Sequence, residues 1–203
     1  SDANTYAQGY FVYDSRKSGS RTTSHLRFGP NPIEAPYLVT KAGFIGIHAW
    51  GILESIDVLT MAREGTTVLL NSPYGPDEVW SKLPSTFQQQ VVDKKLDLWT
   101  IDALSVAREV GLRNRTNTIL QTCFFAISGV LPKDEAIERI KDSIQKTYGK
   151  KSQKIVEMNH AAVDASLEHL FQVKVPESVD ASHDLVEPVR DDSPDFVKTI
   201  TAT

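Results

Sequence analysis

The chain has 203 residues, of which 40% are hydrophobic, and a formal net charge of −4 at pH 7. This length is typical of one large domain or two small ones, and the apolar content is enough for a sizeable core. The negative charge argues against a general nucleic-acid binder. No run of about 18 apolar residues and no basic-then-apolar leader occurs, so we expect a cytoplasmic protein that does not contact a membrane.

The sequence contains a single cysteine, Cys123. One thiol cannot form an internal disulfide, which fits a reducing compartment, and it cannot hold an iron–sulfur cluster or a cysteine-rich zinc site. Its apolar neighbours predict an inert buried thiol rather than a nucleophile. The histidines make no HExxH motif or other close pair, so we expect no metal in this chain. They are His25, His48, His160, His169 and His183.

The N-terminal part of the sequence predicts three strands and one helix. Residues 9–13 alternate aromatic and aliphatic side chains, and residues 23–28 are expected to pair with them as a hairpin. Residues 44–48 follow a proline-rich turn and are typical of a buried strand. Residues 52–63 place apolar side chains at helical spacing, and Gly65 is expected to end this helix.

The middle of the sequence alternates strands and helices. Residues 67–70 (TVLL) are apolar, as in a central strand of a sheet. Residues 76–80 predict a helical piece, residues 96–101 another strand, and residues 103–110 a helix that Gly111 stops. This alternation predicts an α/β fold with three layers, α/β/α, and a mixed central sheet.

The C-terminal part is predicted to be helical and then to end in an extended acidic tail. Residues 118–128, 133–148 and 154–171 have helical apolar spacing. Beyond Pro176 apolar periodicity is lost, which is typical of a linker or of a segment that docks on something absent here. We therefore expect a folded domain over residues 1–176 and a linker or tail over residues 177–203, excised from a longer protein. The acidic residues of this tail are Glu177, Asp180, Asp184, Glu187, Asp191, Asp192 and Asp195.

A basic loop separates the two strands of the predicted hairpin. Small residues let the backbone approach a ligand, and Arg supplies planar forked donors, which suits a phosphorylated ligand. The loop matches neither GxxxxGK[ST] nor GxGxxG, which argues against a nucleotide-hydrolysing P-loop. A phosphate-contacting loop and a solvated basic turn both remain open. The loop contains Ser15, Arg16, Lys17, Ser18, Gly19, Ser20, Arg21, Thr22, Thr23 and Ser24.

A second polar group lies at the start of the helix predicted over residues 118–128. Residues 113–115 (Arg-Asn-Arg) precede it, and Thr116 is expected as its N-cap. Anions favour such helix starts. Asn117 and Gln121 are four residues apart, so both amides lie on one helical face and could contact a polar ligand. The alternative is a capped helix with a polar surface.

Five stretches are informative together: YAQGYFVYDSRKSG, SHLRFGP, EGTTVLLNSPY, NTILQTCFFAISGVLP, and IQKTYGKK followed by MNHAAVD. In this order they resemble the pyruvate:ferredoxin (or flavodoxin) oxidoreductases. The resemblance runs from about Tyr6 to Pro176, and more loosely through EPVRDDSPDFVK. It corresponds to the central gamma domain (domain III) of a longer multidomain enzyme, with the start of the linker towards its ferredoxin-like domain.

This resemblance implies oxidative decarboxylation of pyruvate, transfer of the acetyl group to coenzyme A, and electron transfer to ferredoxin or flavodoxin. In the family, thiamine diphosphate, Mg²⁺ and [4Fe–4S] clusters are held by other domains. The isolated chain is therefore expected to hold no cofactor and to be inactive. Its expected partners are the other domains of the same polypeptide, within an enzyme that forms a homodimer.

The resemblance also implies that the gamma domain contributes to binding coenzyme A. Lys17 is expected to contact a coenzyme A phosphate. Relatives often have Gly where this chain has Ser20, which puts the loop conformation in question. A purely architectural domain without a ligand and a stand-alone subunit are the alternatives. The residues expected to contact coenzyme A are Arg16, Lys17, Ser18, Arg21, Asn117 and Gln121.

Overall fold

The computed structural model describes residues 5–13 and 22–185. Contacts between Cα atoms divide the chain into two units, Ser1–Ala42 and Gly43–Thr203. The domain boundary expected at residue 176 stays a prediction. None of the helices in the described ranges is long and apolar enough to cross a bilayer.

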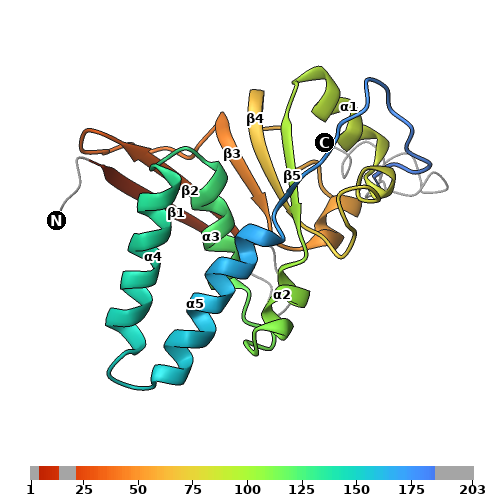
Figure 1. The fold of residues 1–203 in the computed structure, drawn as a ribbon. Coiled ribbons are helices and arrows are strands. Elements are labelled where there is room, and N and C mark those ends of the chain that lie inside the picture. The colour runs from red at the N-terminus through yellow and green to blue at the C-terminus, as the bar shows by residue number, and fades with distance from the viewer. Residues whose placement is uncertain (1–4, 14–21, 186–203) are drawn as a thin grey trace. The chain divides into compact units, whose positions relative to one another are not determined.

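The N-terminal unit contains a two-stranded antiparallel ribbon, formed by β1 (Tyr6–Tyr13) and β2 (Thr22–Gly29) (Figure 1). Tyr6 pairs with Gly29 at one end and Tyr13 with Thr22 at the other, so the predicted hairpin pairing is confirmed. Aromatic and β-branched side chains favour such extended pairing. Residues 15–21 of the predicted basic loop lie outside the described residues, whereas Thr22, Thr23 and Ser24 belong to β2 and not to a loop.

The second unit is built on a four-stranded sheet of order β3-β4-β5-β6. β4 and β5 are parallel, whereas β5 and β6 are antiparallel, so the predicted mixed sheet is confirmed. Parallel neighbours need a crossover connection, and α1 lies in the one between β4 and β5. The elements are β3 (Ala42–Ile47), η1 (Trp50–Glu54), β4 (Ala62–Asn71), η2 (Trp80–Lys82), α1 (Ser85–Asp93), β5 (Asp97–Ile101), α2 (Ala103–Glu109), α3 (Asn117–Ile127), α4 (Lys133–Tyr148), α5 (Gln153–Glu168) and β6 (Phe171–Gln172), where η marks a 3-10 helix.

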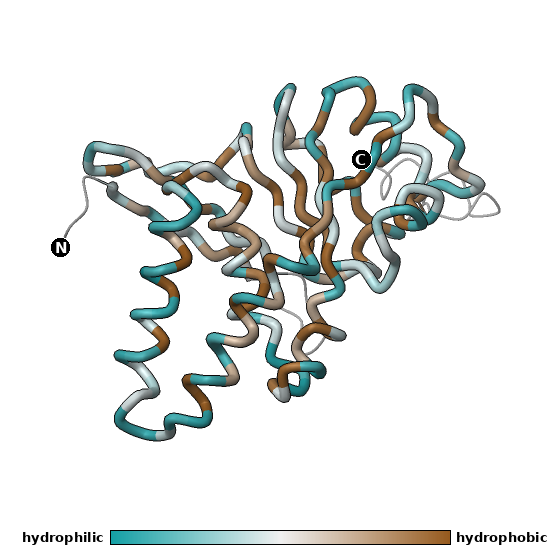
Figure 2. The backbone as a smooth tube through the Cα atoms, in the orientation of Figure 1, coloured by the Kyte–Doolittle hydropathy of each residue, from teal (hydrophilic) through white to brown (hydrophobic). Residues whose placement is uncertain are grey.

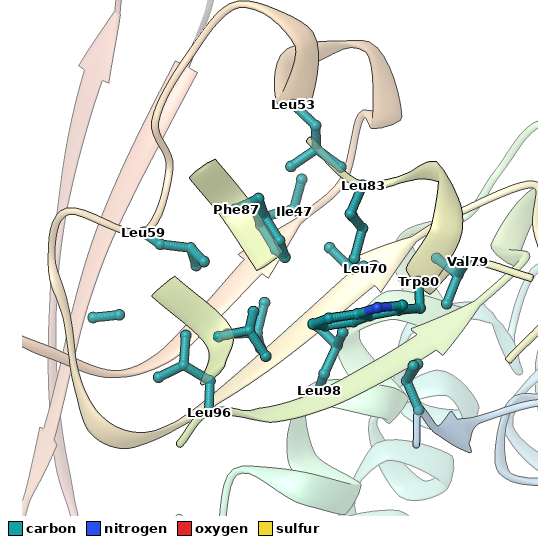
Figure 3. Close-up of a cluster of buried hydrophobic side chains, with 14 residues drawn as sticks. Ile47, Leu53, Leu59, Leu70, Val79, Trp80, Leu83, Phe87, Leu96 and Leu98 are labelled. Atoms are coloured by element: carbon teal, nitrogen blue, oxygen red, sulfur yellow. The ribbon is translucent and has the colours of Figure 1, made fainter. Parts of the chain in front are cut away.

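Helices cover both faces of this sheet, which confirms the predicted α/β/α layers. Val68 and Leu70 of β4 belong to a cluster that includes side chains of α1, whereas Leu69 between them packs with α2, α3 and α5. Successive side chains of a strand point to opposite faces, so a continuous apolar run is what two covered faces require. Figure 3 shows the first cluster, in which Trp80 lies beside Leu98.

The predicted helical C-terminal part is confirmed by α3, α4 and α5, which pack on one another. Ile140 and Ile144 of α4 are buried against Val156 and Val163 of α5. Spacings of four residues in α4 and seven in α5 place each pair on one side of its helix. Figure 2 shows the resulting alternation of hydrophobic and hydrophilic segments along both helices.

The helix predicted over residues 52–63 is wrong. Only the short η1 forms, and the backbone N of Leu59 then donates to Asp57 Oδ1 at 3.0 Å. A side chain that accepts from a nearby backbone group offers an alternative to the helix. Gly65, the residue expected to end this helix, has a positive φ of +72° but lies within β4 and ends no helix.

Other predicted boundaries also change. Residues 76–79 form turns, and the short 3-10 helix η2 begins at Trp80. The α-helix of this region is α1, which the sequence analysis missed although Phe87 and Val91 have helical spacing. The strand β3 is at an edge of the sheet, so of its residues only Ile47 is buried. The last helix ends at Glu168, and Phe171 lies in β6.

We predict that Leu70→Ala lowers the free energy of unfolding by about 2–5 kcal/mol, because it leaves a cavity between the sheet and α1. Leu70 is fully buried. Leu38→Ala deletes the same atoms at a side chain that is 44% exposed, and should cost about 0.5 kcal/mol. Urea unfolding followed by circular dichroism measures both values, and equal losses would contradict the described core.

Candidate functional site

The turn between α2 and α3 presents three polar residues to solvent. Gly111 has a φ of +81°, a conformation that glycine adopts without strain, and Arg113 follows with a φ of +60°. Between them Leu112 is buried, and its backbone N donates to Ala107 O at 2.7 Å. This anchor holds the chain at the end of α2, and residues 113–115 are all exposed beyond it.

The start of α3 leaves backbone donors without a side-chain cap. Thr116 occupies the predicted N-cap position, but its hydroxyl makes no capping hydrogen bond. The first backbone N–H groups of a helix carry a partial positive charge and have no partner within the helix. With Arg113 and Arg115 exposed just before them, these groups give the helix start a positive potential that suits an anion.

Asn117 and Gln121 both lie exposed on α3, one helical turn apart, as expected from their spacing. Neither side chain makes a hydrogen bond with a residue in the described ranges. The opposite side of the helix is buried, and there Thr118 Oγ1 donates to Asn159 Oδ1 of α5 at 2.9 Å. Packing therefore directs the two amides outwards, where a ligand or another domain can reach them.

The other four predicted contact residues lie outside the described residues. Arg16, Lys17, Ser18 and Arg21 all fall within residues 14–21. The strand residues that flank this segment, Tyr13 and Thr22, are partners in the ribbon of the first unit. Because α3 belongs to the second unit, the meeting of the two predicted groups on one ligand stays a prediction.

Cys123 is buried on the inner side of α3, and burial raises the pKa of its thiol to about 12. The thiol is therefore protonated at neutral pH, which suits neither a nucleophile nor a metal ligand. Within residues 5–13 and 22–185 no three His, Cys, Asp or Glu side chains gather closely enough to hold a metal ion. The described residues thus offer no ligand set for Mg²⁺ or for an iron–sulfur cluster, which the resemblance assigns to other domains.

Asn71 makes a structural link between elements that sequence reasoning missed. Its side chain joins the ends of two strands to a helix, because Nδ2 donates to His48 O at 2.9 Å and Oδ1 accepts from Ala103 N at 3.1 Å. In the sequence, its position at the end of β4 is indicated only by the apolar run that directly precedes it. The neighbouring His48 is exposed at the surface, and partial desolvation of its ring lowers the pKa of that imidazole.

These features describe an α/β domain with an exposed polar helix face. Among its described residues we identify no side chain whose surroundings would activate it as a nucleophile, acid or base. A family model described as pyruvate ferredoxin/flavodoxin oxidoreductase matches residues 1–169. The chain belongs to this family.

Relatives at high identity are much longer than this chain. It is 57% identical over 171 residues to a pyruvate-flavodoxin oxidoreductase of Nostoc sp., covering 84% of this chain and 14% of the relative. It is 54% identical over 197 residues to the pyruvate-flavodoxin oxidoreductase of Rhodospirillum rubrum, with coverage of 97% and 16%. With the pyruvate:ferredoxin oxidoreductase of Moorella thermoacetica it shares 46% identity over 195 residues, with coverage of 96% and 17%. The chain thus spans about a sixth of these relatives' length.

A solved structure supports the fold. The crystal structure of pyruvate oxidoreductase subunit PORC from Thermotoga maritima superposes with a TM-score of 0.61 and covers 84% of this chain and 83% of its own. The two sequences are 18% identical, so this likeness concerns the fold alone.

We predict a pH effect from Cys123, whose pKa rises from 9.0 to about 12 on folding. Its stabilising contribution is complete below the unfolded-state pKa and is lost as pH rises towards the folded-state value, because the unfolded thiol ionises first. The free energy of unfolding should therefore fall by up to about 1 kcal/mol per pH unit above roughly pH 9, relative to Cys123→Ala. Urea unfolding of both chains across this pH range measures the difference.

The Cys123→Ala chain corrects for all other groups that titrate at high pH. Iodoacetamide provides a second readout, since the native thiol should react much more slowly than the thiol in urea. Parallel stability curves for the two chains, with rapid labelling of the native one, would contradict a buried thiol of raised pKa.

Proposed function

We propose that this chain is a domain of a longer oxidoreductase that oxidatively decarboxylates pyruvate, transfers the acetyl group to coenzyme A, and passes the electrons to ferredoxin or flavodoxin. The observation that carries the proposal is identity of 54% along 97% of the chain to a relative of which the chain covers only 16%. Similarity along nearly the whole chain is what a domain of such an enzyme would show.

The redox chemistry is assigned to other parts of that enzyme. Thiamine diphosphate, Mg²⁺ and [4Fe–4S] clusters would be held outside this chain, which offers one buried thiol where a cluster needs four thiolates. The isolated chain is accordingly inactive in this proposal. The electron acceptor also binds elsewhere, and the full enzyme is a cytoplasmic homodimer.

The role proposed for the domain itself is to contact coenzyme A. This ligand combines phosphate groups with an arm that contains amides. Lys17, with Arg16, Ser18 and Arg21, would take a phosphate, since a basic loop with small residues suits one. Asn117 and Gln121 would contact polar atoms further along. Support for the second group comes from their shared exposed face on α3 and from the uncapped, basic start of that helix.

We predict that Lys17→Ala in the full enzyme raises the KM for coenzyme A about tenfold to a hundredfold, because a hydrogen bond to a charged group contributes about 1.5–3 kcal/mol. The KM for pyruvate and the kcat should change little, since Lys17 is placed on the second substrate only. Steady-state kinetics with each substrate varied in turn measures the three parameters. Lys17→Arg should recover most of the affinity.

Two controls make this result specific. Lys150→Ala removes an exposed lysine from the turn between α4 and α5, and should leave the KM for coenzyme A unchanged. Asn117→Ala combined with Gln121→Ala should raise it by a few-fold, as expected for neutral hydrogen bonds, whereas Gln145→Ala on the exposed side of α4 should not. An unchanged KM in Lys17→Ala would favour the purely architectural domain.

A further inference from the structure

The helix α1 lacks a cap from its own sequence. Pro84 occupies the N-cap position and has no side-chain acceptor, so the first backbone N–H groups of α1 need partners from elsewhere. Residues 177–185 supply them. The backbone N of Ser85 donates to His183 O at 2.9 Å, and that of Thr86 donates to Asp184 Oδ1 at 3.1 Å. The helix is therefore capped by a residue 98 positions further along the chain.

A buried glutamine on α1 holds the same segment at a second point. Gln88 is fully buried, and its Nε2 donates to Trp80 O at 2.7 Å. Its Oε1 accepts from the backbone N of Asp180 at 2.9 Å and of Ala181 at 3.1 Å. The Gln88 side chain therefore binds backbone groups of the segment and not its side chains. Loss of these partners would be costly, because the amide would then be buried without hydrogen bonds.

The segment is continuous with the core of the second unit. Val173 is buried, Val175 packs against the same cluster as α1, and the chain then runs to the start of that helix (Figure 1). Asp184 is exposed, and hydrogen bonds from Ser85 and Thr86 hold the pKa of its carboxyl well below its ordinary value. A carboxylate at this position also complements the positive end of the helix dipole.

We propose that residues 177–185 form a strap, anchored by Gln88 and Asp184, which caps α1 and fixes the point from which the chain continues beyond residue 185. The first residues of the expected linker, 177–185, are thus an ordered part of this unit and dock on their own chain. α1 and the strap form one cooperative element, since each satisfies the backbone groups of the other. This inference does not rest on the proposed function.

The test is amide hydrogen exchange of the chain, resolved by NMR, in three variants. Asp184→Ala should speed exchange at Ser85 and Thr86 about fivefold, the effect of losing an N-cap. Gln88→Met keeps the buried volume but removes the acceptor, and should speed exchange at Asp180 and Ala181 by at least as much. Glu177→Ala removes an acidic residue from the same strap that makes none of these hydrogen bonds, and should change neither pair.

The amides of β4 and β5 serve as an internal reference, because they report opening of the whole unit. Unchanged exchange there, with faster exchange at the strap and at the start of α1, supports a local anchor. The proposal is overturned if Asp180 and Ala181 exchange in the unsubstituted chain at the rate of an unstructured peptide. It is also overturned if the amides of Asp180 and Ala181 exchange at the same rates in Gln88→Met as in Glu177→Ala.

Discussion

The second unit depends on the parallel pairing of β4 with β5. Residues 67–71 of β4 lie in register with residues 97–101 of β5, and each strand has buried side chains on both faces. A parallel pair requires a crossover, and its apolar faces require cover on each side. α1 meets both requirements on one face, while α2, α3 and α5 cover the other.

This constraint determines where polar function can lie. The inner side of α3 is committed to the core through Ile119 and Cys123, so only its outer side can carry groups for a ligand. Asn117 and Gln121 lie there. The same need for cover makes the start of α1 structurally important, since a helix that seals a core cannot have a frayed end. The strap over residues 177–185 meets that need from a distant part of the sequence.

Sequence patterns predicted the features that depend on local periodicity. The run at residues 67–70 indicated a central strand because both of its faces are apolar, and the stripe along residues 133–148 gave the bounds of α4. The helix expected over residues 52–63 failed because the side chain of Asp57 competes for a backbone N–H. Periodicity registers apolar spacing but not such a local hydrogen bond.

Of the candidate site, only the part that depends on helical spacing was predictable from the sequence. Helical spacing was enough to place Asn117 and Gln121 on one face. The role of Gln88 could not be read from the sequence, because its partner Asp180 is 92 residues away and contributes only a backbone N–H. Whether the basic loop and the α3 face contact one ligand depends on how two units meet, for which no local pattern exists.

Hydrogen exchange of the full-length enzyme, with and without coenzyme A, tests the central claim most directly. If this domain contacts coenzyme A through both groups, peptides covering residues 14–24 and residues 113–121 should exchange more slowly when the ligand is bound. Peptides covering α4 should show no change. Exchange unaltered in both segments at a saturating concentration of coenzyme A would contradict the claim and leave the domain an architectural one.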